Sequence, residues 1–141
     1  MIQVVPFKAE HLTAIKLQHA QMYLSELVTQ EQAVSLETQD SYTATLDGHP
    51  VGAGGIIPQW AGRSIAWAFI AEVGPKNFLY IHRAVKRFID SCYVKRLEIT
   101  VDCEFEAGHR WAGMLGFTKE LDRMVAYRPD GGDCALYARI L

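Results

Sequence analysis

Apolar and polar positions follow two clear periods between Ser64 and Phe117. In Phe78–Tyr93 the apolar residues recur at steps of three and four, which predicts an amphipathic helix. In Lys95–Asp102 they alternate with polar residues, which predicts a strand with one buried face. Ser64–Val73 is predicted as the strand that precedes the helix. A strand, a returning helix and a second strand make a βαβ unit, so we expect the two strands to be parallel neighbours.

The part of the chain before this unit predicts a strand, a helical region and an antiparallel meander. Ile2–Val5 is a short strand, and Lys8 to about Thr29 is mostly helical with a break near Tyr23-Leu24-Ser25. Glu31–Gln39 is polar and is expected to be a loop or a short helical turn. The three strands of the meander are Asp40–Leu46, Pro50–Ile57 and Ser64–Val73. They are joined by turns at Asp47-Gly48 and Pro58–Gly62.

Glycine is concentrated in the second strand of the meander, at Gly52, Gly54 and Gly55. Glycine inside a strand marks a bulge or the close approach of another backbone or of a ligand. The sequence leaves these readings open.

The C-terminal part predicts a short helix and a hairpin. The helix is Phe105–Leu115, and the hairpin consists of Phe117–Arg128 with room for a bulge, a turn at Pro129–Gly132, and Cys134–Leu141. The full order is β-α-β-β-β-α-β-α-β-β, without a repeat or a linker. This order predicts one α/β (α+β) domain over residues 1–141, with a mixed sheet of about six or seven strands and a parallel splay between 64–73 and 95–102.

Composition and charge exclude several classes of protein. Of 141 residues, 50% are hydrophobic and 21% are charged, as expected of a globular domain. The net charge of −2 disfavours a nucleic-acid partner. We also expect no membrane partner and a cytoplasmic location, because the sequence contains neither an apolar run of roughly 20 residues nor a signal-peptide pattern. Cys92, Cys103 and Cys134 lack metal-ligand spacing and are expected to be reduced thiols, with no metal site.

The segment Gly74–Asn77 lies at the predicted start of the long helix and is a candidate phosphate site. A helix start presents unpaired N–H groups and a partial positive charge, and Lys76 adds a full charge. An ordinary strand-to-helix turn is the alternative. The basic face of the helix (His82, Arg83, Lys86, Arg87) is either a second phosphate contact or a solvated surface.

The order of elements, together with Met114-Leu115-Gly116-Phe117 at the end of the short helix, resembles the GNAT fold of acyl-CoA N-acyltransferases. The resemblance implies acetyl-CoA as cofactor and transfer of its acetyl group to an amine of a small molecule or a protein. It implies that the cofactor contacts Val73, Gly74, Lys76, Asn77, Phe78 and Arg83.

Two residues are candidates for proton transfer in such a reaction. Glu72, at the end of the fourth predicted strand, is a candidate base for the attacking amine. His109, on the last predicted helix, is the other candidate, because histidine as a residue type titrates near neutral pH. The alternatives are a solvated carboxylate and a structural histidine.

A narrower set of motifs is similar to phage and prophage GNAT-like proteins, which include an internal virion protein of short-tailed phages. The motifs are His109–Ala112, Leu115–Phe117, Met124, Tyr127–Gly131 and Tyr137–Arg139. Two positions depart from the pattern of catalytic relatives: the phosphate loop has one glycine followed by Pro75, and Ala112 stands where a tyrosine is common. The second hypothesis is therefore a catalytically inactive protein that acts as a virion component or binds a host protein. The edge of the final hairpin is compatible with a homodimer.

Overall fold

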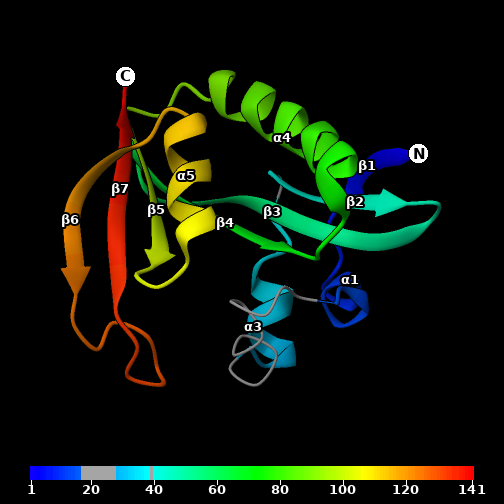
Figure 1. Cartoon of the computed structure of the whole chain (residues 1–141), viewed down its shortest axis with the longest axis horizontal. Helices are drawn as coiled ribbons and strands as arrows, with labels where there is room; N and C mark the ends of the chain where they lie inside the picture. The colour runs from blue at the N-terminus through cyan, green and yellow to red at the C-terminus, as the bar shows by residue number, and fades with distance from the viewer. Residues whose placement is uncertain (17–27, 39) are drawn as a thin grey trace. The chain divides into compact units, whose positions relative to one another are not determined.

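The computed structural model describes residues 1–16, 28–38 and 40–141. These residues form seven strands of one mixed sheet with the order β1-β2-β3-β4-β5-β7-β6 (Figure 1). The strands are β1 (Ile2–Pro6), β2 (Ser41–Leu46), β3 (His49–Trp60), β4 (Arg63–Ile70), β5 (Arg96–Asp102), β6 (Thr118–Met124) and β7 (Cys134–Ile140). The helices are α1 (Ala9–Ala14), α3 (Gln30–Ser35), α4 (Gly74–Asp90) and α5 (Glu106–Met114). The predicted fold class is confirmed, including the parallel pairing of β4 with β5.

Contacts within the chain group it into two compact units. The first comprises Met1–Ile57 and Ala66–Arg87, and the second comprises Pro58–Ile65 and Phe88–Leu141. β4 and α4 contribute residues to both units. In the described ranges, none of the helices has the length and apolar character needed to cross a lipid bilayer.

The β2–β3 hairpin of the first unit turns at Asp47 and Gly48, as predicted. Both residues have positive φ, +51° and +86°, which is the conformation that a two-residue hairpin turn requires. Leu46 and His49 close the turn as a strand pair. β1 extends this sheet on the other side of β2, with Ile2 opposite Leu46.

The core of the first unit forms between the helices and one face of the sheet. Phe7 and Trp67 pack edge to face, with ring centroids 5.2 Å apart. The other apolar residues of this cluster are Leu12, Ile15, Leu36, Val51, Ala53, Ala71 and Val73. The Ala9 N–H donates to Oε1 of Glu37 at 2.6 Å, which ties the start of α1 to the segment after α3.

The first helix of the region predicted as helical, Lys8–Thr29, is shorter than expected. α1 ends at Ala14, because Ile15 is extended with φ −80° and ψ 124°. The predicted break near Tyr23-Leu24-Ser25 lies outside the described residues. The predicted loop or helical turn at Glu31–Gln39 overlaps the helix α3, which spans Gln30–Ser35. Its first turn is closed by Thr29 and Gln32, whose side chains each accept a hydrogen bond from the other's backbone N–H.

The glycines of β3 allow close approach of backbone, one of the predicted alternatives. A Cβ at Gly55 would lie 2.6 Å from the Asp40 carbonyl oxygen, and one at Gly54 would lie 2.9 Å from the Trp67 carbonyl oxygen. The prediction of a turn at Pro58–Gly62 is wrong, since β3 continues to Trp60 and the chain turns at Ala61 and Gly62. Gly62 has φ +94°, which suits a two-residue turn, and the pairing of β3 with β2 has already ended at Gly55.

The second unit is built around β5 and β7, which pair along their whole length from Arg96–Ile140 to Asp102–Cys134. β6 pairs with the other side of β7 with two register shifts, in agreement with the bulge that the sequence allowed. α5 ends at the predicted corner, where Gly116 has φ +92° and the Phe117 N–H donates to the Ala112 carbonyl.

The carboxylate of Glu98 joins the strands of the second unit. Glu98 alternates with the apolar residues of β5, as the pattern predicts, but it is only 7% exposed. Arg63 on β4 donates to both of its oxygens at 2.6 and 2.9 Å, and Arg96 donates to one at 2.6 Å. Arg96 also binds Glu120 on β6. The hydrogen-bonded Arg63, helped by Arg96, lowers the pKa of Glu98 to about 2.

Replacing Glu98 by Gln is expected to make stability depend less on pH. In the folded protein the pKa of Glu98 lies below its ordinary value of 4.5, so the unfolded chain binds more protons between the two values. The stabilisation is complete above about pH 4.5 and is lost as the pH falls toward 2. We expect the E98Q variant to be less stable by about 2 kcal/mol at pH 7. Urea unfolding at a series of pH values should show this gap closing below pH 4.5. A gap that stays constant, as for the exposed control E31Q, would contradict the role of Glu98.

Replacing Gly55 by Ala is expected to destabilise the first unit by about 2 kcal/mol, because the added methyl group would press on the backbone of Asp40 and Ser41. Gly113 of α5 is the matched control. A Cβ there meets nothing within 4 Å, so G113A should be neutral or stabilise by up to about 1 kcal/mol. Urea unfolding of both variants tests the difference, and equal effects would show that β3 tolerates a side chain at this position.

Candidate functional site

The predicted phosphate loop is the first turn of α4 in the first unit. The helix begins at Gly74, so the prediction that it starts at Phe78 is wrong by one turn. Gly74 has φ +81° and nothing lies within 4 Å of the position of a Cβ, so its backbone is open to a ligand. Pro75 fits the first turn, where N–H groups have no helical partner. No acidic residue lies in this turn, so the positive end of the helix dipole is not neutralised there.

The side chains next to Gly74 build this corner. Val73 packs in the apolar cluster around Phe7, and its carbonyl oxygen accepts a hydrogen bond from Nδ2 of Asn77 at 3.1 Å. Phe78 is half-buried and stacks on the ring of His82, with centroids 6.5 Å apart. Backbone N–H groups of the first turn, rather than these side chains, are therefore the donors that the corner offers to an anion.

A row of cations runs along the exposed face of α4. Lys76, Arg83 and Arg87 are all exposed and are spaced by seven and four residues, so they lie on one side of the helix. Lys76 and Arg83 are separated by two turns, roughly 10 Å along the axis. In contrast, His82 and Lys86 of the predicted basic face are half-buried. The row can contact two negative groups of one extended ligand.

The two candidate residues for proton transfer belong to different units. Glu72 is exposed and, among the described residues, makes no hydrogen bond or ion pair, so its carboxylate is available to a ligand. His109 is engaged on both ring nitrogens, with Nε2 3.1 Å from the Cys103 carbonyl oxygen and Nδ1 2.7 Å from Oη of Tyr137. A carbonyl can only accept, so Nε2 carries a hydrogen and, in the neutral ring, Nδ1 accepts from Tyr137.

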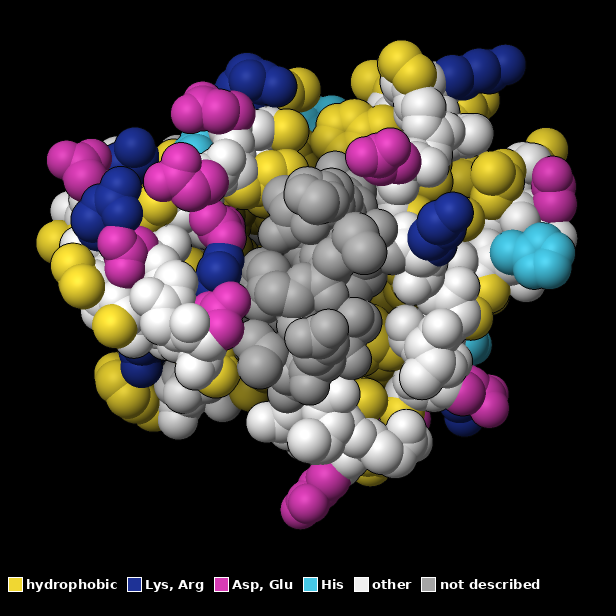
Figure 2. Space-filling model, turned by 60° about the horizontal axis from the view of Figure 1, so that its bottom comes forward, with side chains coloured by type: hydrophobic (Ala, Val, Ile, Leu, Met, Phe, Trp, Pro, Cys, Tyr) yellow, Lys and Arg dark blue, Asp and Glu magenta, His cyan; other side chains and the backbone are white. Residues whose placement is uncertain are grey.

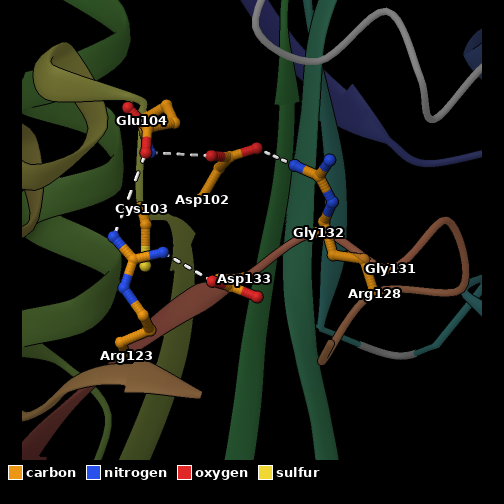
Figure 3. A pocket seen from close by; sticks show the side chains of 8 residues that line it. All are labelled: Asp102, Cys103, Glu104, Arg123, Arg128, Gly131, Gly132 and Asp133. Atoms are coloured by element: carbon orange, nitrogen blue, oxygen red, sulfur yellow. Dashed lines mark hydrogen bonds and ion pairs between the residues drawn. The ribbon is translucent and has the colours of Figure 1, made fainter. Parts of the chain in front are cut away.

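The second unit contains a pocket of about 270 Å³ at the end of β5 (Figure 3). Figure 2 shows acidic and basic side chains interspersed on the side of the molecule where β6 and β7 lie. The pocket is lined by Asp102, Cys103, Glu104, Arg123, Arg128, Gly131, Gly132 and Asp133. In the described part of the chain, no three His, Cys, Asp or Glu side chains are arranged to hold a metal ion.

Arg128 is fixed on one side of the pocket (Figure 3). Its guanidinium pairs with the carboxylate of Asp102 and, through Nε and Nη2, with Asp130 at 2.9 Å each. Arg128 lowers the pKa of Asp130, with help from the N–H of Gly132. A Cβ at Gly132 would meet the Arg128 guanidinium, which would have to shift. This side of the pocket is therefore saturated with internal contacts.

Arg123 lies on the other side of the pocket, and Asp133 holds it. Arg123 Nη1 donates to Oδ2 of Asp133 at 2.5 Å, while the Ala126 N–H donates to Oδ1 at 2.8 Å. The hydrogen bond from the Ala126 N–H, followed by that from Arg123, lowers the pKa of Asp133. The hydrogen bond to Asp133 in turn raises the pKa of Arg123. Arg123 Nη2 is 4.0 Å from Oε1 of Glu104, a carboxylate that is 88% exposed.

The sequence did not indicate this pocket. Its residues come from the end of β5, from β6 and from the β6–β7 connection, and only the pairing of the strands brings them together. The one available signal was the predicted hairpin, which places Arg123 and Asp133 on facing arms. The cofactor residues predicted between Val73 and Arg83 do share one corner and one helix, together with Glu72. His109 belongs to the other unit.

Comparison with known proteins identifies the fold. No protein-family model matches the chain, and no curated protein matches it. Solved structures match over nearly the whole length. Ard1 from Thermoplasma volcanium has a TM-score of 0.79 at 16% identity, covering 99% of this chain and 97% of that one.

Two further structures agree with this match. The ribosomal-protein-S5-alanine acetyltransferase from Vibrio fischeri has a TM-score of 0.69 at 16% identity, with coverages of 99% and 92%. An acetyltransferase of the GNAT family from Bacillus anthracis has a TM-score of 0.68 at 13% identity, with coverages of 99% and 94%. Such low identities establish the architecture and leave the activity to be argued from the residues. The chain therefore has the fold of the GNAT acetyltransferases.

Proposed function

We propose that the protein transfers an acyl group, with acetyl-CoA as donor, to an amine of a small molecule or a protein. The observation that carries the proposal is the fold, which is shared along nearly the whole chain with several acetyltransferases. The α4 corner supports it independently, because it provides an open backbone, a helix dipole and a row of cations in one place.

The start of α4 fits a diphosphate group. Its first-turn N–H groups point away from the helix end, and Lys76 is exposed beside them. Pro75 removes one donor, so fewer N–H groups are available than in a turn without proline. Arg83, two turns further on, is positioned for the separate phosphate of the nucleotide. When bound, acetyl-CoA supplies the thioester that is cleaved.

In the proposed reaction, Glu72 accepts a proton from the attacking ammonium or amine. The amine nitrogen forms a bond to the thioester carbonyl carbon, the carbon–sulfur bond breaks, and the thiolate takes up a proton. His109, whose ring is oriented by Tyr137 in the second unit, is the second residue that we propose for proton transfer. A base within reach of its proton contributes about 10²–10⁴ to the rate of such reactions.

A second candidate function is favoured by two positions. Ala112, which stands where relatives carry a tyrosine, is 2% exposed and cannot donate a proton, and Pro75 weakens the anion site. A protein with this fold and no catalysis would act through binding, either to a host protein in the cytoplasm or within a virion, as the phage-like motifs suggest. Binding of acetyl-CoA separates this candidate from the first.

Acetyl-CoA is expected to bind to the wild-type protein, and K76E is expected to weaken binding at least about tenfold, because the substitution reverses the charge beside the diphosphate. The measurement is isothermal titration calorimetry. K16E is the matched control, since Lys16 is an exposed lysine of the same unit outside α4. Absence of binding to the wild type, or equal losses in both variants, would contradict the proposed cofactor site.

Replacing Glu72 by Gln is expected to lower the turnover rate by about 100-fold, because the amine then lacks a base. The assay follows thiol release from acetyl-CoA with a panel of primary amines and peptides with free amino termini. The affinity for acetyl-CoA should stay within about twofold. E10Q, which changes an exposed carboxylate of α1, is the control. Unchanged turnover in E72Q would remove Glu72 from the mechanism.

A further inference from the structure

The pocket of the second unit contains two oppositely charged groups, Glu104 and Arg123, that are exposed and only loosely paired. Arg128, Asp102 and Asp130 satisfy one another on one side. On the other side, Asp133 uses one oxygen for Nη1 of Arg123 and the other for the Ala126 N–H. The second terminal nitrogen of Arg123 and the carboxylate of Glu104 form the remaining pair, a long ion pair of 4.0 Å.

Glu104 and Arg123 face each other without forming a hydrogen bond. The distance of 4.0 Å between Oε1 and Nη2 exceeds the 2.7–3.2 Å of an N–H···O bond. Their side chains are 88% and 52% exposed, so a ligand can reach both. The N–H of Glu104 donates to Oδ1 of Asp102 at 2.8 Å, which fixes the backbone from which the Glu104 side chain extends.

We propose that this pocket binds a small molecule that carries an ammonium and a carboxylate on the same carbon, a free α-amino acid being the simplest. The ammonium would pair with Glu104 and the carboxylate with the outward edge of Arg123. The two ligand charges are about as close together as the two protein groups. The cavity of about 270 Å³ is near the lower end of the range for ligand sites, which suits a molecule of this size.

The charge of the lining argues against simpler ligands. Three carboxylates and two guanidinium groups line the pocket, so a ligand that is only an anion, such as phosphate, adds to an acidic excess. A ligand that is only a cation leaves the open edge of Arg123 without a partner. A zwitterion satisfies both groups and leaves the net charge of the site unchanged.

This inference concerns the second unit alone and does not depend on acyl transfer. All the lining residues belong to that unit. The pocket is therefore predicted to bind its ligand in the absence of acetyl-CoA. Failure of the cofactor site and failure of this site give separate results, because each is measured with its own ligand.

The test is a screen of free L-amino acids by thermal shift with the full chain, followed by calorimetry of those that stabilise it. We expect at least one to bind with a Kd of about 1 mM or tighter. Its N-acetyl derivative, which lacks the ammonium, and its amide, which lacks the carboxylate, should each bind at least about tenfold more weakly. No binding tighter than about 10 mM by any amino acid, or equal binding of the amide, would overturn the proposal.

Two variants place the ligand in this pocket. E104Q and R123Q should each weaken binding at least about tenfold, whereas E106Q and R110Q, which change exposed charges of α5 outside the lining, should not. Because Arg123 also pairs with Asp133, the stability of R123Q is measured alongside. If R123Q is unstable, the affinity of E104Q alone tests the location of the site, because Glu104 is exposed and its replacement should not affect folding. Wild-type affinity in E104Q would show that the amino acid binds elsewhere.

Discussion

The buried carboxylate of Glu98 is the contact on which the second unit depends. Parallel strands have no hairpin to fix their register, and β4 and β5 place Arg63 directly opposite Arg96. Two guanidinium groups in this position repel each other unless an anion lies between them. Glu98 provides that anion, and Arg96 extends the network to Glu120 on β6, across the intervening strand β7. The same network therefore connects β4, β5 and β6.

The two functional regions are built in different ways. The α4 corner is local, since a glycine with positive φ, a proline and an asparagine follow one another and start a helix whose dipole is not neutralised. The pocket of the second unit is non-local, because Asp102 and Glu104 follow β5 while Arg123 and Asp133 come from the hairpin. Most of its charges pair within hydrogen-bond distance, whereas Glu104 and Arg123 lie 4.0 Å apart.

The structure also gives His109 a defined environment. The hydrogen bonds to Tyr137 and to the Cys103 carbonyl join α5 to β7 and to the end of β5. They fix the tautomer of the neutral ring. His109 thus connects α5 and β7 to Cys103, a residue that lines the charged pocket.

The order of elements, the parallel pair, the Asp47-Gly48 turn and the Leu115-Gly116-Phe117 corner follow from the sequence alone, because periodicity and turn chemistry are local properties. The α4 corner was also predictable as a segment, although proline and glycine concealed that the helix begins at Gly74. Only the tertiary structure decided that Glu98 is buried, that β3 runs to Trp60, and that Arg123 and Glu104 face each other across a pocket. The physical reason is that burial and charge pairing depend on neighbours from distant strands, and a sequence pattern describes each strand without its partners.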